Sequence, residues 1–204
     1  MALKAFAFNC TLKPSPAASS TEKLLREMLA ALEQHDVTGN IVRAVDSNIK
    51  PGVKSDEGAG DDWPGLRKQV LAADILLLGS PIWLGQPSSV SKRVLERMDA
   101  FLGEKDDHGR MPSYGKVAVA VVTGNEDGAH HVGAEFQQAL TEVGFTIPAG
   151  GVTYWVGEAM HSTDYKDLKK PPDVVADWTK MLASNAAHLA RLLQRENYPG
   201  RKAD

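Results

Sequence analysis

The 204-residue chain has little cysteine, no excess of positive charge and no long hydrophobic run. Its single cysteine, Cys10, excludes an intramolecular disulfide and any metal or iron–sulfur site built from several cysteines. The chain has 23 basic and 26 acidic residues, which gives a formal net charge of −3. Because proteins that bind nucleic acid usually carry an excess of basic residues, we expect no nucleic-acid partner. The longest apolar runs, such as residues 117–122, are too short to cross a bilayer, so no membrane partner is expected either.

Two further absences narrow the class of protein. The first ten residues contain one lysine and no long apolar stretch, so we expect no signal peptide and a cytoplasmic location. Neither GxxxxGK[ST] nor GxGxxG occurs, which disfavours a P-loop NTPase and a dinucleotide-binding Rossmann domain. The hydrophobic fraction of 43% is ordinary for a folded domain and excludes overall disorder.

Apolar runs of strand length alternate along the chain with amphipathic stretches of helical period. Strands are expected at residues 3–8, 40–45, 74–79, 116–122 and, with an interruption at 148–151, at 145–156. Helices are expected around residues 22–32, 64–71, 90–102, 132–143 and 175–193, the first behind a capping box formed by Ser19 and Glu22. Alternation of this kind predicts an α/β fold, a doubly wound five-stranded parallel sheet of order 2-1-3-4-5 with helices on both faces.

The chain reads as one domain over residues 1–195, followed by a polar tail over residues 196–204. Residues 48–62 are rich in Gly, Pro, Ser and Asp and predict a long loop, of a length that often serves as a lid or is partly disordered. We expect Cys10 and the pair Tyr154–Trp155 to be packing residues, and Trp178 to belong to the core.

Three strand-to-helix loops are unusual in composition, and a parallel sheet brings all three to its carboxyl edge, where ligands bind. The first loop, residues 9–21 (NCTLKPSPAASST), carries five hydroxyl side chains and Lys13 ahead of a helix N-terminus, which favours a phosphate. The alternative is a polar loop that merely caps the helix.

The second loop, residues 80–89 (SPIWLGQPSS), places Ile82, Trp83 and Leu84 beside two prolines and a glycine. Large apolar groups on a rigid loop suit a flat heteroaromatic ring, and they would also suit a subunit interface. The third loop, residues 123–131 (TGNEDGAHH), has Gly124 and Gly128, which allow backbone amides to approach a ligand closely. Its adjacent histidines point to different faces, so no metal site is expected.

These three motifs, in this order after apolar strands, resemble the flavodoxin-like NADPH-dependent FMN reductase family from residue 3 to about residue 193. The resemblance implies an FMN cofactor whose phosphate is bound by Thr11, Lys13, Ser19, Ser20 and Thr21. It implies that Pro81, Ile82, Trp83, Leu84 and Gly85 pack on the isoalloxazine ring. It also implies that Thr123, Gly124, Asn125, Glu126, Asp127 and Gly128 wrap the pyrimidine side of that ring.

The function that the resemblance implies is an oxidoreductase that passes hydride and electrons from NADPH or NADH through FMN to a small acceptor, such as a flavin or a quinone. Since hydride moves between the two cofactors directly, no catalytic side chain is expected. A homodimer or homotetramer is expected, because the second loop and residues 104–114 need cover. The alternative is a flavodoxin-like electron carrier that docks redox partner proteins, although such carriers are usually more acidic than −3.

Overall fold

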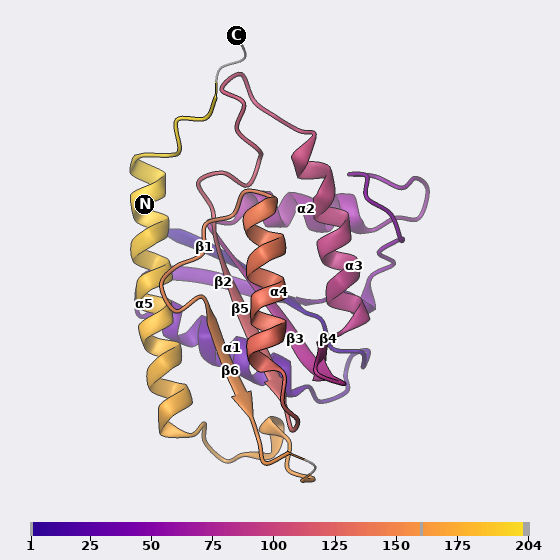
Figure 1. Ribbon diagram of the computed structural model, residues 1–204, viewed down its shortest axis with the longest axis vertical. Coiled ribbons are helices and arrows are strands. Elements are labelled where there is room, and N and C mark those ends of the chain that lie inside the picture. The colour runs from indigo at the N-terminus through magenta and orange to yellow at the C-terminus, as the bar shows by residue number, and fades with distance from the viewer. Residues whose placement is uncertain (1, 160, 202–204) are drawn as a thin grey trace.

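The computed structural model describes residues 2–159 and 161–201 (Figure 1). Its strands are β1 (Leu3–Asn9), β2 (Val37–Arg43), β3 (Ile75–Trp83), β4 (Gln86–Pro87), β5 (Val117–Gly124) and β6 (Val152–Val156). Its α-helices are α1 (Ser20–Glu33), α2 (Trp63–Ala72), α3 (Ser89–Met98), α4 (Ala129–Glu142) and α5 (Asp173–Arg195). Strands and helices therefore alternate as the sequence predicts.

The sheet has the predicted topology. Its five parallel strands follow the order β2-β1-β3-β5-β6, which is the doubly wound, flavodoxin-like arrangement. The two-residue strand β4, which the sequence analysis did not predict, adds an antiparallel pair to the end of β3. All carboxyl ends of the parallel strands thus meet at one edge of the sheet.

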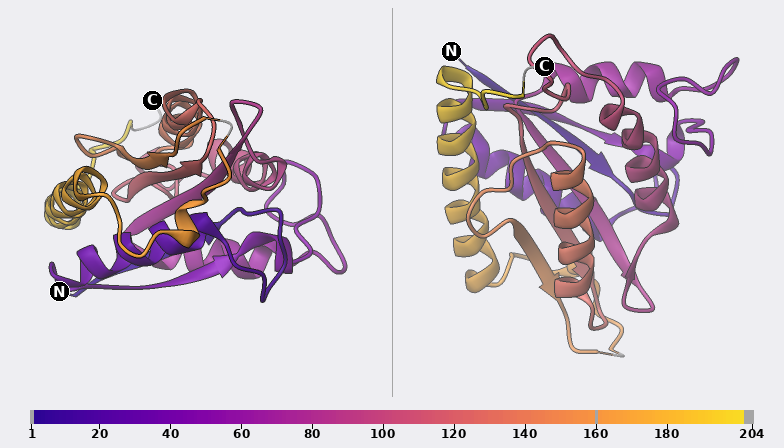
Figure 2. Two further views of the ribbon diagram at one scale, coloured as in Figure 1. Left: turned by 90° about the horizontal axis from the view of Figure 1, so that it is seen from below. Right: turned by 45° about the horizontal axis from the view of Figure 1, so that its top comes forward.

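Side-chain alternation along the central strands builds a core on each face of the sheet. Phe6 and Phe8 on β1 point into one core with side chains of α2, α3 and α4, whereas Ala5 and Ala7 point into the other with α1 and α5. Figure 2 shows the two helical layers on opposite sides of the strands. Because both faces are covered, the central strands are almost wholly apolar.

Three predicted strands have other bounds in the structure. The last is confined to β6 (Val152–Val156), and residues 145–148 contribute an isolated bridge between Thr146 and Val117. The second strand begins at Val37 rather than at residue 40, because buried Val37 pairs with Leu3 at the start of β1, and residues 44–46 form a short 3-10 turn. The third strand does not stop at residue 79. It continues through Pro81, which pairs with Thr123, and turns back as β4, so half of the expected loop is a hairpin.

The long loop before α2 is held in place by one buried arginine. Arg97 on α3 donates hydrogen bonds to the carbonyl of Lys50 (2.9 Å), twice to that of Lys54 (3.1 and 2.8 Å) and to the Asp61 carboxylate (2.7 Å). Neither the Arg97 nor the Asp61 side chain is exposed, and the guanidinium also lies over the Trp63 ring. The loop is therefore folded onto α3 rather than free to act as a lid.

Two segments differ from their expected roles. Trp178 is 43% exposed rather than part of the core, because its indole N–H reaches out to the Val152 carbonyl on the edge strand β6 (2.8 Å). The expected tail also makes contacts: the Tyr198 ring lies against Tyr114 (5.7 Å between centroids), and its hydroxyl bonds Thr146 (3.0 Å). The last expected tail residues, 202–204, lie outside the described residues.

Replacing Arg97 by methionine should lower the free energy of unfolding by about 3–5 kcal/mol, because the buried Asp61 carboxylate loses its charge partner. Urea denaturation of the purified variants measures this. The control is Glu96→Met on the same helix, which removes an exposed charged side chain and should change stability by less than about 0.5 kcal/mol. Equal losses in the two variants would show that the buried pair does not hold the loop.

The same pair predicts a pH dependence of stability. Burial raises the pKa of Asp61, but the hydrogen bond from Arg97 and three backbone amides outweigh it and lower the pKa from 3.8 to about 2. A depressed pKa in the folded state stabilises the fold above pH 3.8, and this contribution is lost as the pH falls toward about 2. Asp61→Asn should therefore be less stable at pH 7 and have a flatter stability profile between pH 4 and pH 2, measured by urea denaturation across that range.

Candidate functional site

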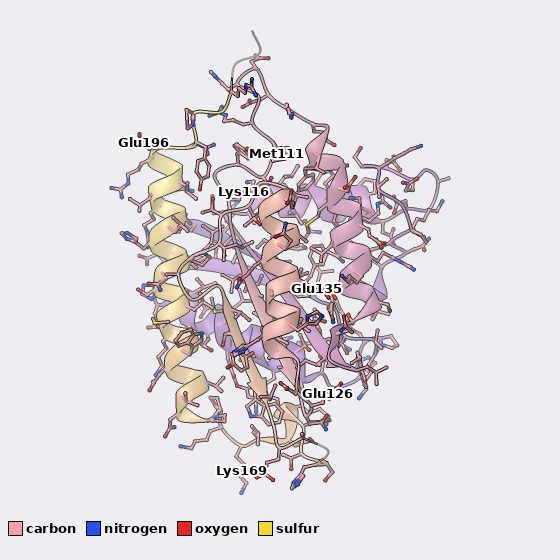
Figure 3. All side chains as sticks on the ribbon, in the orientation of Figure 1. Met111, Lys116, Glu126, Glu135, Lys169 and Glu196 are labelled. Atoms are coloured by element: carbon pink, nitrogen blue, oxygen red, sulfur yellow. The ribbon has the colours of Figure 1, made fainter. Side chains whose placement is uncertain are left out.

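One pocket at the carboxyl edge of the sheet collects residues from all three loops that the sequence analysis singled out. Figure 3 labels Glu126 and Lys169 at this end of the molecule, toward which β6 points. The first loop contributes Thr11, Lys13, Ser19, Ser20 and Thr21; the second contributes Pro81, Ile82 and Trp83; and the third contributes Thr123, Gly124, Asn125 and Glu126. The other four expected site residues, Leu84, Gly85, Asp127 and Gly128, do not line the pocket but form the junction between the second and third loops.

The N-terminus of α1 offers unused backbone donors to this pocket. Ser19 is the N-cap: its hydroxyl accepts from the Glu22 amide (3.1 Å) and its carbonyl from the Lys23 amide (3.2 Å). In the part of the chain that the structure describes, the amides of Ser20 and Thr21 donate to no protein group. Two free amides at a helix N-terminus are donors of the kind that can bind an anion.

The predicted capping box is only half formed. The Glu22 side chain does not return to the Ser19 amide but accepts hydrogen bonds from Arg43 and Arg26. Burial raises the pKa of the Glu22 carboxyl, but the bonds and charges of the two arginines outweigh it, so the pKa lies below its ordinary value. The carboxylate beside the anion site is therefore ionised and paired.

Buried hydroxyl groups link the loops to one another by hydrogen bonds. The Thr21 and Thr123 hydroxyls, both buried, bond one another (2.9 Å) and join the first loop to the third. Ser88 Oγ donates to the Cys10 carbonyl (2.7 Å), and the Ser88 amide donates to Ser80 Oγ (3.0 Å). Either hydroxyl can be the donor in the Thr21–Thr123 pair, and the Thr21 amide stays free for a ligand.

The second loop carries exposed apolar surface on a tight hairpin turn. Leu84 (φ +53°) and Gly85 (φ +73°) form the turn, and the Leu84 amide donates to Glu126 Oε1 (2.9 Å). Trp83, which lines the pocket, is 50% exposed, and Leu84 is 92% exposed. A leucine with positive φ and almost full exposure is locally unfavourable, as is typical of residues kept for function.

The third loop presses directly on the second. Gly128 has φ +128°, a backbone conformation that residues with a side chain rarely adopt. A Cβ at this position would also lie 2.7 Å from the Gly85 Cα atom, so there is no space for a side chain. Among the described residues, the amides of Asn125 and Glu126 donate to no protein acceptor. This loop therefore also presents donors to the pocket.

A fourth wall was missed by the sequence analysis. The end of β6 and residues 164–166, which precede α5, bring Trp155, Asp164, Tyr165 and Lys166 to the pocket. Lys23 donates to the Tyr165 carbonyl (3.1 Å), and the Lys166 amide donates to Ser20 Oγ (3.2 Å). The rule that every parallel strand ends at the same edge could have found this segment, although its composition gives no sign.

Titratable groups around the pocket are held in fixed charge states. Burial and the bonded Glu27 carboxylate raise the pKa of the Tyr165 hydroxyl, which stays protonated. Hydrogen bonds to Asp164 and Asp167 raise the pKa of the Lys166 ammonium. Burial raises the pKa of the Cys10 thiol, in agreement with its expected packing role, and Trp155 packs on Tyr165 as well as facing the pocket. The Tyr165 hydroxyl and the Cys10 thiol therefore stay protonated at neutral pH.

The donors and surfaces of the pocket fit FMN. A phosphate suits the free amides of Ser20 and Thr21 with Lys13 beside them. A flat apolar ring suits the exposed face of Trp83, and the carbonyl-bearing edge of such a ring suits the free amides of Asn125 and Glu126.

Comparisons with known proteins agree with this geometry. A family profile described as NADPH-dependent FMN reductase matches residues 3–161. The 8-demethyl-8-aminoriboflavin-5'-phosphate synthase of Streptomyces davaonensis is 32% identical over 97% of this chain and 81% of its own length. The crystal structure of RosB with bound 8-demethyl-8-formylriboflavin-5'-phosphate superposes with a TM-score of 0.89 at 31% identity, over 97% of this chain and 82% of that one.

A third relative is much longer than this chain. A Mycobacterium bovis protein named divalent metal cation transporter MntH is 37% identical over 94% of this chain, but the chain spans only 29% of its length. Among the described residues, none of the helices combines the length and apolar character needed to span a membrane. With the profile matching most of its length and the fold and pocket in agreement, the chain belongs to the NADPH-dependent FMN reductase family.

Proposed function

We propose that the protein is an FMN-dependent oxidoreductase that takes hydride from NADPH or NADH and reduces a small-molecule acceptor. The observation that carries the proposal is the convergence of three loops on one pocket, with free amides at the N-terminus of α1 and in the third loop on either side of exposed Trp83. Bound FMN would supply the redox chemistry, accepting hydride from the nicotinamide and releasing electrons to the acceptor.

The protein's own residues bind FMN and orient it. The amides of Ser20 and Thr21 and the Lys13 ammonium hold the phosphate, and Trp83 with Ile82 supports one face of the ring. The amides of Asn125 and Glu126 donate to the pyrimidine edge and stabilise the negative charge that reduction places there. We assign no catalytic side chain, since the buried groups nearby are locked in one protonation state.

A second candidate is that a flavin phosphate is the substrate and is itself altered. The similarity to the RosB complex favours it, because RosB binds a modified riboflavin 5'-phosphate and matches this chain over nearly its whole length. The two candidates share the phosphate site and differ in the fate of the flavin. Mass spectrometry of the flavin recovered after incubation distinguishes them: an unchanged mass after NADPH turnover supports the reductase, and a changed mass supports flavin modification.

The proposal includes a homodimer or homotetramer in the cytoplasm. Exposed Leu84 and Trp83 at the tip of the second loop support association, since such side chains are costly to leave in water. A partner subunit would cover Leu84, which does not line the pocket, and leave the pocket mouth beside Trp83 open.

Purified protein incubated with FMN and desalted should retain a flavin absorption spectrum, and anaerobic NADPH should bleach it. The reason is that the pocket provides donors for both ends of FMN while leaving the mouth open beside Trp83. Retained flavin that neither NADPH nor NADH bleaches would instead favour an electron carrier. Absence of saturable FMN binding in a fluorescence titration would contradict both.

Replacing Gly128 by valine should weaken FMN binding by at least about tenfold, or 1.4 kcal/mol. A side chain at this position collides with Gly85 and pushes the second and third loops apart. The matched control is Gly65→Val on α2, where a Cβ meets no atom within 4 Å. Fluorescence titration gives the affinities and thermal melting reports the fold; unchanged FMN affinity in a folded Gly128→Val protein would refute the assignment of the third loop.

A further inference from the structure

The first loop is held from behind by an arginine that no sequence motif indicated. Arg43, the last residue of β2, donates from Nη1 to the carbonyls of Lys13 (3.1 Å) and Ala17 (2.8 Å), and from Nη2 to Glu22. Its side chain is only 8% exposed. It lines a groove together with residues 16–19 and does not line the pocket itself.

An aspartate three residues later holds the same loop at a second point. Asp46 accepts from the Ser15 amide (2.9 Å) and from the Ser15 hydroxyl (2.5 Å). These two bonds hold the pKa of the Asp46 carboxyl below its usual value, so it is ionised at neutral pH. Two side chains therefore hold the first loop. Arg43, at the end of β2, binds carbonyl oxygens of the loop, and Asp46, in the 3-10 turn that follows, accepts hydrogen bonds from its Ser15.

This arrangement decides which backbone groups the loop can show to a ligand. Carbonyl oxygens repel an anion, and Arg43, which does not line the pocket, occupies those of Lys13 and Ala17 with hydrogen bonds. Across residues 13–21 the amides of Ser20 and Thr21 stay without a protein acceptor in the described structure. The loop consequently presents donors to the pocket, and it does so with its backbone already fixed.

We propose that Arg43 is the positioning residue that makes the first loop selective for a flavin carrying a 5'-phosphate over the same flavin without one. The inference rests on the proposed function, because it assumes that the phosphate of FMN lies at the N-terminus of α1. Arg43 does not contact the phosphate. It binds two carbonyls of the loop and thereby fixes the position of the amides that bind the phosphate.

The rival explanation is that Arg43 acts only as a nearby positive charge that neutralises Glu22. Arg26 provides the comparison, since it also pairs with Glu22 (2.6 Å) and lines the same groove, but it contacts no carbonyl of the first loop. Removing either arginine takes away one charge beside Glu22. Only removal of Arg43 releases the loop.

The experiment measures the dissociation constants of FMN and riboflavin for the full chain and for Arg43→Met, Arg43→Lys and Arg26→Met, by quenching of flavin fluorescence. Arg43→Met should weaken FMN binding by about tenfold or more while riboflavin binding changes less than about twofold. Arg43→Lys, which can still reach one carbonyl, should fall between Arg43→Met and the unaltered chain. Arg26→Met should leave the FMN-to-riboflavin affinity ratio within about twofold of the unaltered chain.

The outcomes separate this inference from the proposed function. If the unaltered chain binds FMN no more tightly than riboflavin, the phosphate site itself is wrong. If it prefers FMN but Arg43→Met keeps that preference, or Arg26→Met loses it equally, Arg43 is not the positioning residue. A general loss of stability would weaken both flavins together, so the ratio distinguishes loop positioning from unfolding, and melting curves of each variant verify the fold.

Discussion

The parallel pairing of β1, β3 and β5 fixes where every functional segment lies. Asn9 pairs with Gly79, and Pro81 pairs with Thr123. The loops that follow β1, β3 and β5 therefore all begin at the same edge of the sheet. The pairing is stabilised by two apolar cores, because Phe6 and Phe8 serve one face and Ala5 and Ala7 the other. Without this register the hydroxyl, aromatic and glycine-containing loops would not share a pocket.

Around that edge, charged side chains hold the backbone through hydrogen bonds, while backbone amides of the first and third loops have no acceptor among the described residues. Arg43 and Asp46 secure the first loop, and Lys23 and Glu27 secure the segment around Tyr165. These charges are satisfied by protein atoms. The loops around the pocket are thus held by charge-assisted hydrogen bonds, and free amides on a fixed backbone lower the entropic cost of binding an anion.

The sequence was sufficient for the features that are local in the chain. Apolar runs and helical stripes predicted the alternation of elements, the Ser19 cap and the three loops that now line the pocket. It failed where residues distant in sequence decide the structure. Nothing in the local pattern marks Arg43 and Asp46, because their role depends on a loop about 30 residues earlier in the chain. The start of β2 likewise depends on Val37 pairing with Leu3.

Trp178 has a consequence for the behaviour of the sheet in solution. β6 is an edge strand, and a free edge can pair with another chain and seed aggregation. The indole N–H of Trp178 occupies the outward carbonyl of Val152, and the ring covers the strand beside Gly150. The hydrophobic pattern assigned Trp178 to the core, but its side chain instead covers part of the free edge of β6. A residue that covers an edge strand lies at the surface, which accounts for its partial exposure.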